Sequence, residues 1–193
     1  MSVVSIVVCG VGGQGILTAS DIISFVALKE GYDVKKSEVH GMAQRGGSVV
    51  SEVRFGEKVY SPLVTDGMAD FILSFEKLEA LRNLPRLKKG GSVISNDYEI
   101  KPAPVLIGDS EYPKDIGERI KKTGVEIKLI DGLKLAKEAG NVRTVNTVLL
   151  GALAKKLSFS KEMWIDAILE RVPKKTHNEN KKAFELGYNY KGD

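Results

Sequence analysis

Cysteine and histidine are scarce in this sequence. Its 193 residues include one cysteine, Cys9, and two histidines, His40 and His177. A single thiol excludes an internal disulfide and cannot hold an iron–sulfur cluster or a cysteine-based zinc site. The two histidines stand far apart without the spacing of a metal-ligand pair, so we expect no metal site on this chain. Any redox chemistry must therefore be carried by a bound group or by another chain.

Long apolar runs and basic patches interleaved with aromatic residues are absent as well. No run approaches the roughly 20 apolar residues that span a bilayer, which excludes an integral membrane protein. The first residues lack a basic region and lead into a glycine-rich turn, so we expect a first strand and a cytoplasmic location instead of a signal peptide. The net charge of +4 is spread over interleaved basic and acidic residues. No nucleic-acid partner is expected, because no clustered aromatics or binding module accompany the basic residues.

The hydrophobic pattern predicts alternating strands and helices. Short apolar runs predict strands at 3–9, 32–36, 69–75, 92–96 and 125–130. Helical spacing predicts helices at 16–30, 76–87, 113–122, 133–139, 142–157, 161–169 and 178–188. Partial alternation predicts an antiparallel hairpin of 48–55 with 58–60. We predict one α/β domain over 1–193, Rossmann-like, with a mostly parallel sheet, an inserted β-hairpin and a helical C-terminal third.

A glycine-rich turn joins the first predicted strand to the first helix. Gly10, Gly12 and Gly15 match GxGxxG, with Gly13 and Gln14 between them. Glycine lets the backbone turn tightly and approach a ligand, and the free N–H groups of a helix start favour a phosphate or carboxylate. The turn is therefore a candidate cofactor-binding site. The alternative is that its glycines only permit close packing of strand and helix, and Gln14 either contacts a ligand or partner or caps backbone groups.

A nicotinamide dinucleotide is the default ligand of such a turn. It requires an acidic residue about 20 residues further on, at the end of the second strand, to bind the ribose. Glu38 follows Gly15 by 23 residues, so the spacing permits this role. The elaborate segment that follows Glu38 is not required by a ribose-binding carboxylate, and it indicates another function.

The turn and this segment carry a resemblance to a known family. The chain resembles the gamma-type domain of the 2-oxoacid:ferredoxin oxidoreductases, and within them the beta subunit of indolepyruvate:ferredoxin oxidoreductases. The likeness covers nearly the whole chain but not residues 98–125, which match no motif. It rests on GVGGQGI at 10–16, SEVHGMAQRGGSVVSEVRFG at 37–56, KVYSPL at 58–63, ADFILSFEKLEALR at 69–82, NTVLLGAL at 146–153 and NKKAFELG at 180–187.

The resemblance implies a role in a complex that oxidatively decarboxylates aryl-2-oxoacids such as indolepyruvate. The products are an acyl-CoA, CO2 and reduced ferredoxin. The family uses thiamine diphosphate and [4Fe-4S] clusters, but this chain has no GDG motif followed by a distant Asn and only one cysteine. The resemblance therefore implies that a larger alpha subunit holds these cofactors. This chain becomes an accessory subunit, inactive alone, that shapes the mouth of the active site and helps to place coenzyme A.

The segment HGMAQRGG supplies the candidate substrate or interface residues His40, Arg45, Gly46 and Gly47. Arg45 either clamps a carboxylate or phosphate with its planar fork or forms an ion pair with an acid such as Glu38. The two glycines keep the approach open. His40 either donates to an anionic ligand or is a satisfied structural histidine. No residue of this chain is assigned as catalytic.

Two other functions stay open on the residues alone. One is a nicotinamide dehydrogenase built on the glycine turn, and the other is a stand-alone sensor of CoA or nucleotides. Two neighbouring residues are expected to be structural. Cys9 is predicted to be a buried, inert thiol, and Glu76 is expected to interact with the dipole at a helix start.

Overall fold

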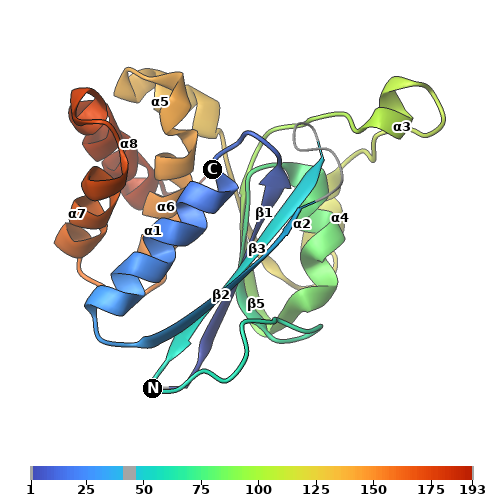
Figure 1. Cartoon of the computed structure of the whole chain (residues 1–193). Coiled ribbons are helices and arrows are strands. Elements are labelled where there is room, and N and C mark those ends of the chain that lie inside the picture. Colours follow the sequence, from blue (N-terminus) through green and yellow to red (C-terminus); the bar gives the residue numbers. More distant parts are fainter. Residues whose placement is uncertain (1, 41–46, 193) are drawn as a thin grey trace.

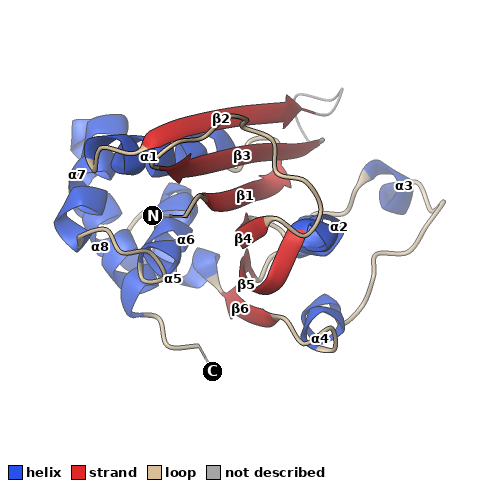
Figure 2. Ribbon diagram, turned by 90° about the horizontal axis from the view of Figure 1, so that it is seen from below, coloured by secondary structure: helices blue, strands red, loops and turns tan. Residues whose placement is uncertain are grey.

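The computed structural model describes residues 2–40 and 47–192, and its centre is a sheet with helices on both faces (Figures 1 and 2). Within these residues the sheet has six strands in the order β2-β3-β1-β4-β5-β6. The strands are β1 Val4–Val11, β2 Asp33–His40, β3 Ser48–Gly56, β4 Ala69–Ser74, β5 Leu87–Asn96 and β6 Glu126–Ile130.

The sheet is mostly parallel, as predicted. β1, β4, β5 and β6 pair with one another in parallel. β3 is antiparallel to both of its neighbours, β1 and β2, so β2 runs in the same direction as β1. The carboxyl ends of five of the described strands therefore lie at one edge of the sheet, which we call the carboxyl edge.

The predicted hairpin of 48–55 with 58–60 was wrong, although the first of its strands does form an antiparallel pair with another strand. β3 pairs with β2, from Asp33 opposite Gly56 to His40 opposite Val49, and residues 58–60 form no strand. The N–H of Val59 donates instead to the Asp33 carboxylate at 2.9 Å. A side chain thus satisfies a backbone group that a hairpin strand would have paired with the sheet.

The helices follow the predicted order with shifted ends. The predicted helix at 142–157 begins with a 3-10 turn, and the one at 76–87 ends earlier in such a turn. A short helix within residues 98–125, α3, was not predicted. The helices are α1 Ile16–Lys29, α2 Lys77–Asn83, α3 Ala103–Leu106, α4 Ile116–Lys121, α5 Gly132–Ala139, α6 Val145–Ala154, α7 Lys161–Arg171 and α8 His177–Asn189, with 3-10 turns η1 Leu84–Arg86, η2 Val142–Thr144 and η3 Lys174–Thr176.

Helices cover the two faces of the sheet unequally (Figure 2). α1 and α5–α8 cover one face, over the larger hydrophobic cluster that contains Phe55, Trp164 and Phe184. α2 and α4 cover the other face, over a smaller cluster that contains Cys9 and Ile72. None of the helices in the described part of the chain is long and apolar enough to cross a membrane.

Two glycines allow α6 and α8 to pack backbone against backbone. A Cβ on Gly151 would lie 2.2 Å from the carbonyl oxygen of Phe184, and a Cβ on Gly187 would lie 1.9 Å from that of Val148. These glycines belong to the segments at 146–153 and 180–187 that carried the family resemblance. Each of these two segments therefore contains a glycine that the close packing of α6 against α8 requires.

Candidate functional site

A cleft opens at the carboxyl edge of the sheet, where open α/β sheets bind their ligands. The glycine-rich turn after β1, the ends of β4 and β5, and the starts of α5 and α6 form its walls. Its volume is about 440 Å³. The cleft is lined by Gly13, Gln14, Gly15, Phe75, Asn96, Tyr98, Leu133, Val142, Arg143, Val145 and Asn146.

The glycines of the turn have different structural roles. Gly13 and Gly15 have φ angles of 101° and 86°, in the left-handed region that favours glycine. Gly10 lies inside β1, where a Cβ would come within 2.8 Å of the Phe75 side chain. Gly10 therefore permits close packing, whereas Gly13 and Gly15 shape the wall of the cleft.

Gly15 places the start of α1 beside the cleft. It is the N-cap of this 14-residue helix, it offers no side-chain cap, and the first turn contains no acidic residue. The first N–H groups of a helix have no partner inside the helix and carry the positive end of its dipole. The glycine turn thus presents uncapped backbone donors at a place where an anion is favoured.

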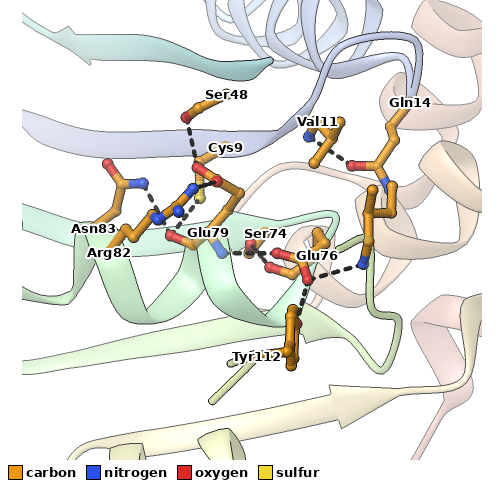
Figure 3. Close-up of polar contacts among 11 residues, drawn as sticks. Cys9, Val11, Gln14, Ser48, Ser74, Glu76, Glu79, Arg82, Asn83 and Tyr112 are labelled. Atoms are coloured by element: carbon orange, nitrogen blue, oxygen red, sulfur yellow. Dashed lines mark hydrogen bonds and ion pairs between the residues drawn. The ribbon is translucent and has the colours of Figure 1, made fainter. Parts of the chain in front are cut away.

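Two amide side chains, the half-buried Gln14 and the buried Asn96, join the loops around the cleft. Gln14 accepts a hydrogen bond from Val11 N at 2.7 Å (Figure 3), and it donates to the Phe75 carbonyl at 3.0 Å. Asn96 donates to the same carbonyl at 3.3 Å and accepts from Gly132 N at 3.0 Å. Gln14 therefore bonds backbone groups, and together the two amides fix the turn, the end of β4 and the start of α5 relative to one another.

Arg143 is the one charged side chain among the described residues that line the cleft. It lies in η2, directly before α6, and its side chain is exposed. Asn146 follows one helical turn later, with its amide nitrogen 3.2 Å from the position of a Cβ on Gly15. Sequence reasoning did not select Arg143, because it stands 128 positions after Gly15 and no motif of the sequence includes it.

The predicted residues after β2 are only partly described by the structure. Arg45 and Gly46, and the side chain of His40, lie outside the described residues. The carbonyl of Gly47 accepts a hydrogen bond from Gly12 N at 2.9 Å. The next residue, Ser48, donates from its hydroxyl to the Glu79 carboxylate at 2.6 Å (Figure 3). The C-terminal end of the HGMAQRGG segment is thus hydrogen-bonded to the glycine turn, and the residue that follows it is hydrogen-bonded to α2.

Glu38 is badly placed for a dinucleotide ribose. The antiparallel strand β3 lies between β1 and β2, so Glu38 is two strand spacings, or roughly 10 Å, from the strand that ends in the glycine turn. Its carboxylate forms an ion pair with Lys36 at 2.6 Å. This topology disfavours the nicotinamide dehydrogenase.

Cys9 is buried, as predicted, and carries no reactive thiolate. Burial, the largest cause, and the nearby carboxylates of Glu79 and Glu76 together raise the pKa of its thiol to about 12, against the opposing effects of a Ser74 hydrogen bond and of Arg86. Its sulfur lies 3.6 Å from the carbonyl oxygen of Glu79 (Figure 3). A neutral, buried thiol is neither a nucleophile nor a cluster ligand.

Glu76 has the helix-start role that was expected, and it also anchors a distant segment. Its carboxylate caps α2 by accepting from Glu79 N at 2.9 Å. The same carboxylate accepts from Ile100 N at 3.2 Å and from the hydroxyl of Tyr112 (Figure 3). Burial and this carboxylate raise the pKa of Tyr112 well above its usual range. Glu76 thus holds together three segments that are distant in sequence.

Comparisons with known proteins match the chain over almost its full length. The family model described as pyruvate ferredoxin/flavodoxin oxidoreductase matches residues 5–190. The chain is 49% identical over 188 residues to the indolepyruvate oxidoreductase subunit IorB of Thermococcus kodakarensis, covering 95% of this chain and 93% of that protein. It is 38% identical to the subunit IorB of Methanothermobacter thermautotrophicus, covering 95% of each. The resemblance inferred from the sequence is therefore confirmed.

Solved structures show the same fold. A keto/oxoacid ferredoxin oxidoreductase gamma subunit from Geobacter sulfurreducens superimposes with a TM-score of 0.70 at 25% identity, over 96% of both chains. A 2-oxoglutarate:ferredoxin oxidoreductase from Magnetococcus marinus, solved with 2-oxoglutarate, coenzyme A and succinyl-CoA, superimposes with a TM-score of 0.73 at 22% identity. The match covers 97% of this chain and 31% of that one. Family model, relatives and fold agree, and the chain belongs to the pyruvate ferredoxin/flavodoxin oxidoreductase family.

Proposed function

We propose that this chain is the accessory subunit of a complex that oxidatively decarboxylates aryl-2-oxoacids of the indolepyruvate type. The complex forms an acyl-CoA and CO2 and passes electrons to ferredoxin. The observation that carries this proposal is the 49% identity to an indolepyruvate oxidoreductase subunit over 95% of the chain. The cleft at the carboxyl edge agrees with it, because the described residues that line it offer binding groups and include no redox group.

The redox chemistry is assigned to a larger alpha subunit. The only thiol of this chain is buried and its pKa is raised to about 12, so its donor set does not fit an iron–sulfur cluster. The described residues also contain no group of three His, Cys, Asp or Glu side chains that could hold a metal ion. Thiamine diphosphate on the partner would supply the carbanion chemistry, and [4Fe-4S] clusters there would remove electrons one at a time.

Coenzyme A is proposed to place a phosphate group in the cleft. The uncapped start of α1 favours an anion, and Arg143 adds a guanidinium that matches phosphate oxygens. Gly13 and Gly15 keep the backbone accessible, while Gly10, Gly12 and Gln14 hold the turn in shape. This division of roles extends the sequence-based assignment, since Arg143 and Asn146 join the glycine turn in the proposed site.

The segment His40, Arg45, Gly46 and Gly47 is proposed to meet the substrate or the partner beside this cleft. The hydrogen bond between Gly12 N and the Gly47 carbonyl supports this placement. Arg45 belongs to the same segment as Gly47, which is hydrogen-bonded to the glycine turn. We therefore propose that Arg45 binds an anionic group of the 2-oxoacid or of coenzyme A.

Reconstitution tests the proposed function. The chain and the larger subunit are purified separately and assayed with indolepyruvate, coenzyme A, thiamine diphosphate and ferredoxin. We expect this chain alone to be colourless, free of iron and inactive, and the mixture to reduce ferredoxin. Turnover by this chain alone, or an inactive mixture of two folded subunits, would contradict the proposal.

A further inference from the structure

Residues 97–115, which we call the arm, project from the carboxyl edge beyond the helices and strands around them (Figures 1 and 2). The arm connects the end of β5 to α4 and carries α3 near its tip. Two large apolar residues lie there side by side, Leu106 with 70% and Ile107 with 71% of its surface exposed. Adjacent apolar side chains this exposed have an unfavourable contact with water that a partner would remove.

The tip is ordered by its own sequence. Three of the six prolines of the chain, Pro102, Pro104 and Pro113, lie in the arm, and each fixes a backbone angle. The carbonyl of Pro102 accepts from Leu106 N at 3.1 Å, and that of Pro104 accepts from Asp109 N at 2.9 Å. The two exposed residues are therefore presented in one backbone conformation, which lowers the entropy that a binding event must remove.

The base of the arm is fixed to the body of the protein. The buried carboxylate of Glu76 binds both limbs, through Ile100 N and the hydroxyl of Tyr112. Lys77 strengthens the first limb through ion pairs with Asp97 at 2.8 Å and Glu99 at 2.9 Å. A buried carboxylate that joins two limbs positions the arm relative to the sheet.

The arm is continuous with the rim of the cleft. Its first limb follows Asn96 and contains Tyr98, and both residues line the cleft. Tyr98 is 43% exposed, and Val142 on the facing rim is 52% exposed. The chemistry assigned to the larger subunit must reach this cleft, so the surface of that subunit must approach the same edge from which the arm projects.

We propose that Leu106 and Ile107 insert into an apolar pocket of the larger catalytic subunit, so that the arm fixes that subunit over the cleft. This inference rests on the proposed function, because the partner is the subunit that carries the redox cofactors. Two exposed apolar side chains on a hydrogen-bonded backbone would bury apolar surface in such a pocket, and a few buried residues carry most of the affinity of an interface.

The test measures the affinity between the purified larger subunit and full-length variants of this chain. We expect Leu106→Asp and Ile107→Asp each to raise Kd about tenfold or more, and the double variant roughly a hundredfold. Both positions are exposed, so the melting temperature of each variant should match that of the wild type. Leu63→Asp is the matched control. Leu63 is 57% exposed in the segment between the end of β3 and the start of β4, at the opposite edge of the sheet, and its substitution should leave Kd within about threefold.

The outcomes separate the two proposals. Loss of binding in the arm variants alone supports the inference. A double variant that binds as tightly as the wild type overturns the inference and leaves the proposed function intact. A wild-type chain that does not bind the larger subunit overturns both. If the wild type is a dimer that the double variant dissociates while Kd for the larger subunit is unchanged, the occupant is a second copy of this chain and the inference is wrong.

Discussion

The two faces of the sheet are stabilised by different means. On the face covered by α1 and α5–α8, the buried side chains are mostly apolar, and buried polar ones such as Ser20, Thr147 and Asn180 are uncharged. There α6 and α8 approach until only glycine fits between them. On the α2 face, the apolar cluster is smaller and buried carboxylates accompany it. Glu52, Glu76 and Glu79 are each at most 4% exposed, and Arg86, Tyr112 and Ser48 respectively bind them.

This difference shows how the protein divides stability from function. Apolar packing gains free energy without regard to direction, whereas a buried carboxylate lowers stability unless donors are placed around it. Two of these donors belong to segments around the site, because Ser48 directly follows the HGMAQRGG segment and Tyr112 lies in the arm, whereas Arg86 lies in η1. The carboxylates therefore position the segments that frame the site, and the apolar face supplies the stability that this arrangement requires.

The largest loss of stability is expected on the apolar face, when a single methyl group is added there. Gly187→Ala would place a Cβ 1.9 Å from the carbonyl oxygen of Val148. Backbone atoms cannot move away cheaply, so α6 and α8 must separate. We expect a loss of about 3 kcal/mol or more in the free energy of unfolding, measured by urea titration.

A control separates this clash from the backbone effect of glycine. Gly67 has a φ angle of 74°, and a Cβ there would meet nothing within 4 Å. Gly67→Ala should therefore lower the free energy of unfolding only by the cost of holding an alanine in the left-handed conformation, about 1–2 kcal/mol. Equal losses for the two variants would show that the contact between α6 and α8 is not as tight as described.

The α2 face should show an effect that depends on pH and is smaller over any one pH unit. Burial holds the pKa of Cys9 at about 12, above the ordinary value of 9.0. Above pH 9.0 the unfolded chain releases this proton and the folded chain keeps it, so rising pH favours unfolding until about pH 12. The variant Cys9→Ala has no thiol, so it has no proton to release at this position. The stability of the wild type should therefore fall relative to this variant by up to about 1.4 kcal/mol per pH unit in that range. Parallel pH curves from urea titrations would mean that the thiol is not desolvated.

The sequence predicted the elements better than their pairing. The apolar run before Cys9 and the helical spacing after Gly15 are local patterns, and the structure confirms both. The position of β3 between β1 and β2 is a long-range choice, and local alternation gave no information on which strand Ser48–Gly56 would join. The hairpin was therefore placed on the wrong side of β3.

The site was predictable only where it was contiguous in sequence. The glycine turn follows a known chemical pattern, so Gly13, Gln14 and Gly15 were selected and do line the cleft. Arg143 and Asn96 reach the same cleft through the order of the sheet, which no local pattern encodes. The arm was missed because residues 98–125 match no motif and its four-residue helix, which contains Pro104 and follows Pro102, is too short to show a helical spacing of apolar residues.

We propose that this subunit contributes a site for coenzyme A at the carboxyl edge while its partner performs the redox chemistry. The most direct measurement is the KM for coenzyme A of the reconstituted complex that contains Arg143→Ala. Arg143 is exposed, so the melting temperature should not change. Loss of a charge-assisted hydrogen bond to phosphate, worth about 1.5–3 kcal/mol, should raise this KM roughly ten- to a hundredfold and leave the KM for the 2-oxoacid unchanged. An unchanged KM for coenzyme A, with wild-type turnover, would contradict the account.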